Sequence, residues 1–177
     1  MMLKIAAISF LVVLSSMSSC NRDTQQHPEK VENPEQFNDQ LVNVNKTMVE
    51  NESIEIENYI KRHKWDMQRT GTGLRYLIYQ QGSGEAATTG KIAVLKYTVN
   101  LLDGKECYSS ENTGPKEFMI GKGGVESGLE EGIKLLKVGD KAKFIFPPHL
   151  AHGLTGDDDK IPARATLVYD VELIQLK

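Results

Sequence analysis

The stretch FMIGKGGVESGLEEGIKLLKVGDKAKFIFPP, residues 118–148, decides the fold. Its middle part predicts a short helix, because Leu129, Ile133 and Leu136 recur at helical spacing and Gly139 follows as a stop signal. The period then changes to two in KAKFIFP, which is typical of a half-buried strand. A short helix followed directly by a strand indicates a domain that mixes helix and sheet.

Strand patterns lie on both sides of this stretch. The segments LRYLIY (74–79), IAVLKYTVNLLDGKECYS (92–109) and TLVYDVELIQLK (166–177) are rich in alternating apolar, aromatic and β-branched residues. Asp103-Gly104 is a tight-turn signal inside the second segment. We therefore expect an α+β fold in which a small antiparallel sheet curls around one short helix.

Residues 41–66 predict an amphipathic helix ahead of this domain. Its apolar positions stand at helical spacing, and Glu57 and Lys61 are placed for an i,i+4 ion pair. The apolar positions are Val49, Ile56, Tyr59 and Ile60. Such a helix could pack on its own domain, pair with a second copy or contact a partner, and packing on its own domain is the usual outcome.

The first residues have the pattern of an export signal. Lys4 precedes an apolar run from Ile5 to Leu14, which is too short to span a membrane, and small residues then lead to Cys20. Residues 1–19 are thus expected to be a lipoprotein signal peptide, with Cys20 as the lipidated residue, although Met17 stands where leucine is usual. The alternative is an ordinary signal peptide that is cleaved nearby. Residues 20–40 are strongly polar and are expected to form a flexible tether.

Chain length, net charge and cysteine count limit the classes of protein to which the chain can belong. A chain of 177 residues has room for one compact domain and an appendage. The net charge of −3 gives no broad basic field, so we expect no nucleic-acid partner. Only Cys107 remains besides Cys20, so a lipid on Cys20 would leave no intramolecular disulfide.

Three segments in order resemble one known family. They are GKIAVLKYTVNLLDGKECYSS (90–110), the 118–148 stretch, and AHGLTGDDDKIPARATLVYDVEL (151–173). Their residues, order and spacing are similar to those of the FKBP-type peptidyl-prolyl cis-trans isomerases over residues 74–177. The resemblance implies an FKBP-like fold and rotation of X-Pro amides. Together with the lipoprotein signal, the chain resembles the FKBP-type lipoproteins associated with gliding motility in Bacteroidetes.

The resemblance also implies a set of pocket residues. Five positions match the family's apolar pocket and are the expected catalytic residues: Tyr97, Phe118, Val125, Ile161 and Tyr169. Alternation along the strands places Tyr97 and Tyr169 on the core side of the sheet. Ordinary core packing is the alternative role for each of the five.

Five further positions depart from the family pattern and are expected to bind substrate in altered form. Cys107 replaces a phenylalanine that packs on proline, Tyr108 an aspartate, and Leu129 the tryptophan at the pocket floor. Glu126 replaces an aliphatic residue whose backbone N–H binds a ligand carbonyl, and His152 replaces a tyrosine that reaches the ligand carbonyl. We expect lowered activity and weak binding of FK506, because aromatic walls supply much of such a pocket's binding energy.

The implied reaction requires no cofactor and no metal, because amide rotation breaks no bond. A metal site would have to use His149, His152 and the run Asp157–Asp159, whose residue types suit zinc or nickel but whose spacing is not diagnostic. Exposure of His152 in a loop is the alternative to its role in the pocket. A run of aspartates in a glycine-containing loop is usually only solvated.

Two functions follow. The first is a lipid-anchored isomerase that faces the periplasm and acts on X-Pro segments of exported or gliding-motility proteins, held to the membrane through Cys20. The second is a non-catalytic FKBP-like chaperone or binding module of an envelope complex, since fold alone does not establish catalysis.

Overall fold

The computed structural model of the chain describes residues 34–177. The predicted signal peptide, Cys20 and most of the predicted tether lie outside these residues. The helices are α1 (Pro34–His63), α2 (Ser110–Thr113) and α3 (Ser127–Ile133), with a 3-10 turn η1 (Pro148–Leu150). The strands are β1 (Gln68–Arg69), β2 (Arg75–Gln80), β3 (Ile92–Leu101), β4 (Glu106–Ser109), β5 (Lys116–Met119), β6 (Lys141–Phe146) and β7 (Leu167–Leu176).

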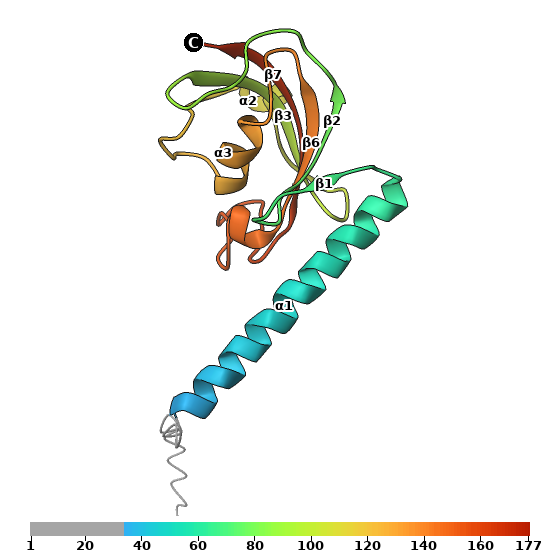
Figure 1. Cartoon of the computed structure of the whole chain (residues 1–177), viewed down its shortest axis with the longest axis vertical. Helices are drawn as coiled ribbons and strands as arrows, with labels where there is room; N and C mark the ends of the chain where they lie inside the picture. Colours follow the sequence, from blue (N-terminus) through green and yellow to red (C-terminus); the bar gives the residue numbers. More distant parts are fainter. Residues whose placement is uncertain (1–33) are drawn as a thin grey trace, which may run out of the picture. The chain divides into compact units, whose positions relative to one another are not determined.

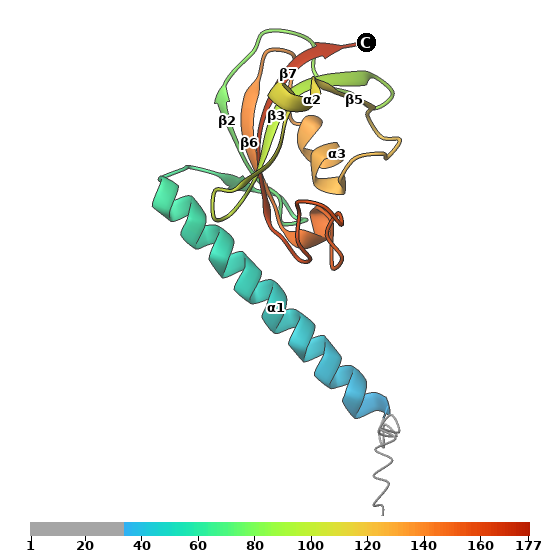
Figure 2. The same cartoon turned by 180° about the vertical axis from the view of Figure 1, so that it is seen from behind.

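The strands form one antiparallel seven-stranded sheet with the order β1-β2-β6-β7-β3-β4, and β5 pairs with β3 beside β4. Its long central strands curl past α3, as Figures 1 and 2 show from opposite sides. This arrangement agrees with the α+β fold expected from the sequence. Helix α3 is shorter than predicted and ends at Ile133, because Leu135 and Leu136 continue in a turn that leads into β6.

Alternation gives the sheet an inner and an outer face. Tyr169 of β7 lies between Phe144 of β6 and Val99 of β3, and all three side chains are buried under α3. The next residue, Asp170, pairs with Lys143 and Thr98 and points to the outer face. The inner face therefore carries the main core, and the outer face is largely charged.

Helix α3 approaches the inner face closely because it carries glycine where it meets the sheet. A Cβ built on Gly128 would lie 2.7 Å from Phe146 Cδ1, and one on Gly132 would lie 3.0 Å from Phe144 Cε1. The larger apolar residues of the helix, Leu129 and Ile133, are both 0% exposed. This contact fixes the start of α3, and with it the loop that forms the site described below.

Helix α1 spans Pro34–His63, so it begins seven residues before the start predicted at residue 41 and ends before residue 66. The predicted tether therefore extended too far, and its last residues join the helix, where proline is tolerated in the first turn. Near its C-terminal end, Ile56 and Tyr59 pack on Ile145 and Val168 of the outer face. No helix in the described part of the chain has the length and apolar character needed to cross a membrane.

Polar contacts reinforce this junction. Arg75 of β2 is 3% exposed, and its guanidinium donates hydrogen bonds to Glu57 Oε1, Ser53 Oγ and the carbonyl of Gly73. Arg164 in the loop before β7 donates to Glu52 Oε1. Buried arginine is tolerated only when its donors find partners, so these contacts tie α1 to the domain.

Candidate functional site

A pocket of about 410 Å³ opens beside the N-terminus of α3. Residues of β5, of the loop before α3 and of the turn after η1 line it: Lys116, Gly124, Val125, Glu126, Ala151 and His152. The 118–148 stretch thus supplies its central part, and strand β5 and the 151–152 turn close its sides.

The position of Glu126 is the main feature of this pocket. Its side chain is only 9% exposed and reaches inward from the N-cap of α3. Its Oε1 accepts a hydrogen bond from the Tyr169 hydroxyl at 2.7 Å and lies 3.2 Å from His152 Nε2. Its Oε2 lies 3.7 Å from Lys116 Nζ. A carboxylate with cationic and hydroxyl partners therefore occupies the base of the pocket.

The surroundings of Glu126 set its charge. Burial raises the pKa of this carboxyl, but the Lys116 ammonium, the Tyr169 hydroxyl, its own backbone N–H and His152 outweigh burial and hold the pKa below its ordinary value. Burial and the adjacent Glu126 carboxylate in turn raise the pKa of Tyr169. At neutral pH the pocket contains an ionised Glu126 and a protonated Tyr169.

Lys116 connects this carboxylate to the aromatic wall. Its ammonium lies 5.6 Å from the centre of the Tyr97 ring, within the range of a cation–π contact. The Tyr97 hydroxyl is 2.9 Å from Thr113 Oγ1, and the Tyr97 backbone N–H donates to Ser110 Oγ. Helix α2 thus holds Tyr97 in place, half-buried on the inner side of β3.

Lys116 was not among the pocket residues predicted from the sequence, where Phe118 was expected to form the aromatic wall of this region. In the β3–β5 pairing, Phe118 is opposite Ala93 and Lys116 is opposite Leu95, so both point to the inner face. Phe118 is buried in the core at 8% exposure and does not line the pocket, whereas Lys116 does. Because side chains alternate along β5, Lys116 points to the same face of the sheet as Phe118. This alternation could have identified Lys116 from the sequence.

A second tyrosine–carboxylate pair lies at the other side of the site. The Tyr108 hydroxyl donates to Asp157 Oδ2, and Asp157 Oδ1 accepts from the backbone N–H groups of Ile161 and Asp159. These hydrogen bonds outweigh partial burial and lower the pKa of Asp157 to about 2. The hydrogen bond to Asp157 raises the pKa of Tyr108. Tyr108 therefore anchors the 157–161 loop.

The other predicted residues lie deeper. Cys107, Leu129, Ile161 and Tyr169 are between 0% and 3% exposed and belong to the main core. Burial raises the pKa of the Cys107 thiol. Of the ten predicted residues, Val125, Glu126 and His152 line the pocket, and Tyr169 touches it through Glu126.

The loop before α3 is fixed from behind by Glu130. Its carboxylate accepts hydrogen bonds from the backbone N–H groups of Gly121 and Gly123, at 2.7 and 3.1 Å. Both glycines have positive φ, which other residues adopt at a cost. Glu130 thereby holds the segment that carries Val125 and Glu126.

The two histidines considered as metal ligands point to different places. His149 Nε2 lies 2.9 Å from the carbonyl oxygen of Thr72, near the junction with α1, whereas His152 faces Glu126. Among residues 34–177, no group of three or more His, Cys, Asp or Glu side chains is arranged to hold a metal ion. The alternative metal site therefore lacks its assumed geometry.

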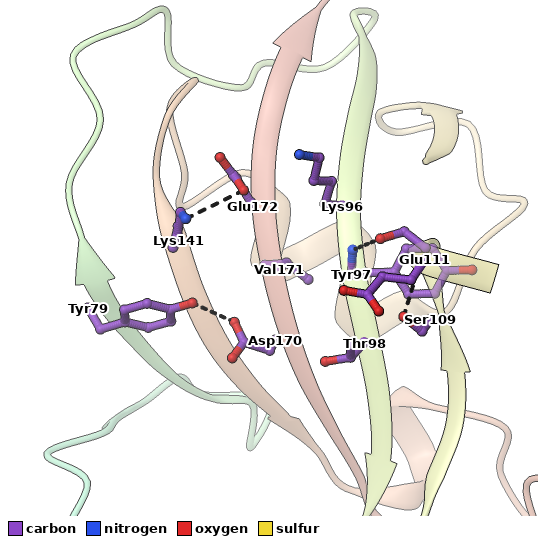
Figure 3. Close-up of a pocket in the computed structure, with 11 residues that line it drawn as sticks. Tyr79, Lys96, Tyr97, Thr98, Ser109, Glu111, Lys141, Asp170, Val171 and Glu172 are labelled. Atoms are coloured by element: carbon purple, nitrogen blue, oxygen red, sulfur yellow. Dashed lines mark hydrogen bonds and ion pairs between the residues drawn. The ribbon is translucent and has the colours of Figure 1, made fainter. Parts of the chain in front are cut away.

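A different hollow, of about 270 Å³, lies on the outer face of the sheet (Figure 3). Several of its polar side chains are paired across the strands. Tyr79 donates to Asp170 Oδ1, and Lys141 lies 3.6 Å from Glu172 Oε2. These side chains satisfy one another, and the unpaired Lys96 and Glu111 are exposed to water. This hollow therefore lacks a buried polar group that requires a ligand.

Comparisons with known proteins agree with the fold and the sequence pattern. The family model described as FKBP-type peptidyl-prolyl cis-trans isomerase matches residues 83–174, just over half of the 177 residues. The chain belongs to this family. The FKBP-like fold expected from the sequence is thereby confirmed.

Individual relatives of the FKBP family point the same way. FkpA from Escherichia coli, described as an FKBP-type peptidyl-prolyl cis-trans isomerase, is 40% identical over 112 residues, which are 63% of this chain and 40% of FkpA. The probable FkpA from Neisseria meningitidis is also 40% identical, over 111 residues that cover 62% of this chain and 40% of that protein. This chain thus spans well under half the length of these relatives.

Solved structures of the FKBP family superpose on the chain. The crystal structure of FkpA from Escherichia coli gives a TM-score of 0.64 with 37% identity and covers 77% of this chain and 64% of that one. The crystal structure of AtFKBP13 gives a TM-score of 0.62 with 30% identity and covers 64% of this chain and 100% of that one. The AtFKBP13 chain is thus matched over its whole length.

Proposed function

We propose that the chain is an active peptidyl-prolyl cis-trans isomerase with reduced turnover, acting on X-Pro segments of exported proteins. The observation that carries the proposal is the pocket beside α3, which Val125 lines and which Glu126 and Lys116 connect to Tyr169 and Tyr97. It occurs in a domain that belongs to the FKBP family.

The proposed reaction needs positioning and no bond cleavage. Rotation about an X-Pro amide has a barrier of about 18–20 kcal/mol, because the C–N bond has partial double-bond character. A pocket lowers this barrier if it binds the twisted amide more tightly than the planar one. Here Val125 and Tyr97 would enclose the proline ring and exclude water.

Reduced turnover follows from the polarity of the pocket. The Glu126 carboxylate lies close to its own backbone N–H, which the family uses to bind a ligand carbonyl. A peptide carbonyl must therefore compete with that carboxylate. Cys107 and Leu129 supply less apolar contact area than the aromatic residues they replace.

The deciding experiment is a prolyl-isomerisation assay with the purified protein and short X-Pro peptides, with and without FK506. We expect acceleration that is only weakly inhibited by FK506. The Tyr97→Ala variant should lose most of this acceleration while its circular dichroism stays that of a folded protein. Absence of acceleration by the folded wild-type protein would reject the enzymatic proposal.

One specific observation favours a second function, that of a non-catalytic chaperone or binding module in an envelope complex. The ionic cluster around the buried Glu126 carboxylate suits the holding of a polar segment better than the desolvation of a prolyl amide. Binding of client peptides without any acceleration would support this function.

We further propose that a lipid on Cys20 anchors the protein to the membrane, with the domain facing the periplasm and serving gliding-motility or secretion machinery. The basis is the signal pattern that ends at Cys20 and the resemblance to gliding-motility lipoproteins. Mass spectrometry of the mature N-terminus tests the anchor. Detection of an unmodified N-terminus at another residue would contradict it.

A further inference from the structure

The Glu126 carboxylate is only half satisfied. Oε1 has two partners, but Oε2 is buried and has no hydrogen-bond partner, alone among the buried side-chain nitrogen and oxygen atoms of the described part of the chain. An ionised carboxylate can accept about four hydrogen bonds. A buried acceptor without a partner is costly, and here it belongs to a side chain that lines a pocket.

The group that covers Oε2 is replaceable. The Lys116 ammonium is 3.7 Å away, which is longer than a hydrogen bond, and its side chain is 29% exposed. Lysine carries its charge on a long flexible stem and can extend into water. The carboxylate, by contrast, is held by Tyr169 and His152. An incoming cation could therefore take the place of Lys116 at a fixed negative charge.

An acidic segment follows the turn that carries His152 and lines a neighbouring hollow. The segment Asp157–Lys160 carries three carboxylates and one ammonium. Asp158 and Asp159 are exposed to solvent. Exposed carboxylates beside a cleft attract cationic segments and repel anionic ones.

We propose that Glu126 makes this cleft selective for prolyl segments that carry a lysine or arginine side chain beside the proline. The cationic group displaces Lys116 and donates a hydrogen bond to Glu126 Oε2. This inference rests on the proposed function, because it assumes that the pocket beside α3 binds prolyl segments.

The test compares three peptides that differ only in the residue before proline: arginine, leucine or glutamate. Both the isomerisation rate and the direct binding by fluorescence anisotropy are measured. We expect the arginine peptide to be favoured over the leucine peptide by about five- to tenfold, the size of a partly screened charge-assisted hydrogen bond. The glutamate peptide should bind most weakly.

Single substitutions distinguish the effect of Glu126 on peptide selectivity from the effect of the protein's overall surface charge. Glu126→Gln keeps the shape of the side chain and should bring the arginine-to-leucine ratio close to one. The control is Glu117→Gln, a carboxylate of β5 that pairs with Lys177 outside the pocket and should leave the ratio unchanged. Lys116→Met removes the competing cation and should increase the ratio, which provides a second test if Glu126→Gln does not fold.

The results test the proposed selectivity and the proposed isomerase activity separately. Equal binding of the arginine and leucine peptides, stronger binding of the glutamate peptide, or a ratio that survives in Glu126→Gln overturns the inference. If the arginine peptide is bound preferentially but no peptide is isomerised faster, the inference on selectivity holds and the enzymatic function fails.

Discussion

The same chemical pair, a tyrosine hydroxyl bound to a carboxylate, occurs on both faces of one sheet at consecutive residues of β7. On the inner face, Tyr169 is 1% exposed and donates to Glu126. On the outer face, Asp170 accepts from Tyr79, which is 48% exposed, and also pairs with Lys143. Both pairs have charged neighbours, but the outer pair is in contact with water, whereas the inner pair is buried.

The contribution of a tyrosine–carboxylate pair to stability and binding therefore depends on whether the pair is buried or in contact with water. In water either partner of the outer pair can be replaced by solvent, so the contact contributes little to stability or binding. In the interior, loss of one partner leaves the other without a substitute. The inner pair thus combines structural importance with an unfilled hydrogen-bond acceptor, which is the property expected of a binding site.

The largest expected effect tests whether the inner face is tightly packed, as this comparison requires. Gly128→Ala places a Cβ within 2.7 Å of Phe146 and 2.9 Å of the carbonyl of Leu150. We expect it to lower the free energy of unfolding by about 2–3 kcal/mol, because α3 must move away from β6. Urea unfolding measures this. Gly71→Ala is the control, since that Cβ meets no atom within 4 Å; equal midpoints for the two variants would contradict close packing.

The second prediction concerns removal of the tyrosine hydroxyl from each pair in turn. Tyr169→Phe should lower the free energy of unfolding by about 2 kcal/mol, because it removes a donor from the buried Glu126 carboxylate. Tyr79→Phe should change it by less than about 0.5 kcal/mol, because water replaces the lost hydroxyl. Chemical unfolding of both variants provides the measurement. A larger loss in Tyr79→Phe would reverse the comparison.

The third prediction concerns the pair Tyr108 and Asp157, which lies neither in the core nor on the outer face of the sheet. The folded-state pKa of Asp157, about 2, is below the ordinary value of about 3.9 for the unfolded chain, so its ionised form stabilises the fold above pH 4. That stabilisation is lost as the pH falls from about 4 to about 2. In Tyr108→Phe, NMR titration of the carboxyl carbon should show a higher pKa for Asp157, kept below 3.9 by the two backbone N–H donors.

A matched variant isolates this contribution. Asp157→Asn cannot ionise, so its thermal unfolding temperature should depend less steeply on pH between 2 and 4 than that of the wild-type protein. Parallel pH curves for the two proteins would mean that other carboxyl groups account for acid unfolding.

The last prediction concerns the charged residues of the outer face, where only a small effect on stability is expected. Asp170→Asn removes a charge that pairs with Lys143 beside the rings of Trp65 and Tyr79. We expect a loss of less than about 1 kcal/mol that becomes smaller as salt is added. A loss that is large and independent of salt would show that this exposed cluster behaves like a buried one.

Much of the fold could be predicted from the sequence, because it depends on local signals. The change of period after Leu136, the Asp103-Gly104 turn and the inward alternation of Tyr97 and Tyr169 are all readable within short windows. The start of α1 was misplaced because polar residues dominate its first turns, and helices of this kind show little apolar periodicity there.

The candidate site was only partly predictable. Alternation gives the face of a strand but not its partner, so the sequence did not show that β5 brings Lys116 to Glu126. The contact of Tyr108 with Asp157 joins residues 49 positions apart and depends on how the 157–161 loop folds back. The buried state of Glu126 was also unforeseen, because a glutamate at the start of a helix is ordinarily solvated and favoured there by the helix dipole.

The junction between α1 and the outer face has a consequence for folding and aggregation. The part of the chain that matches the FKBP family model begins at residue 83, after α1 and β2. A chain cut there would leave β6 as an unpaired sheet edge and would uncover Ile145 and Val168, which Ile56 and Tyr59 now shield. Exposed edges with apolar neighbours promote self-association. We therefore expect a stable domain to require the C-terminal turns of α1, in a chain that begins before residue 56.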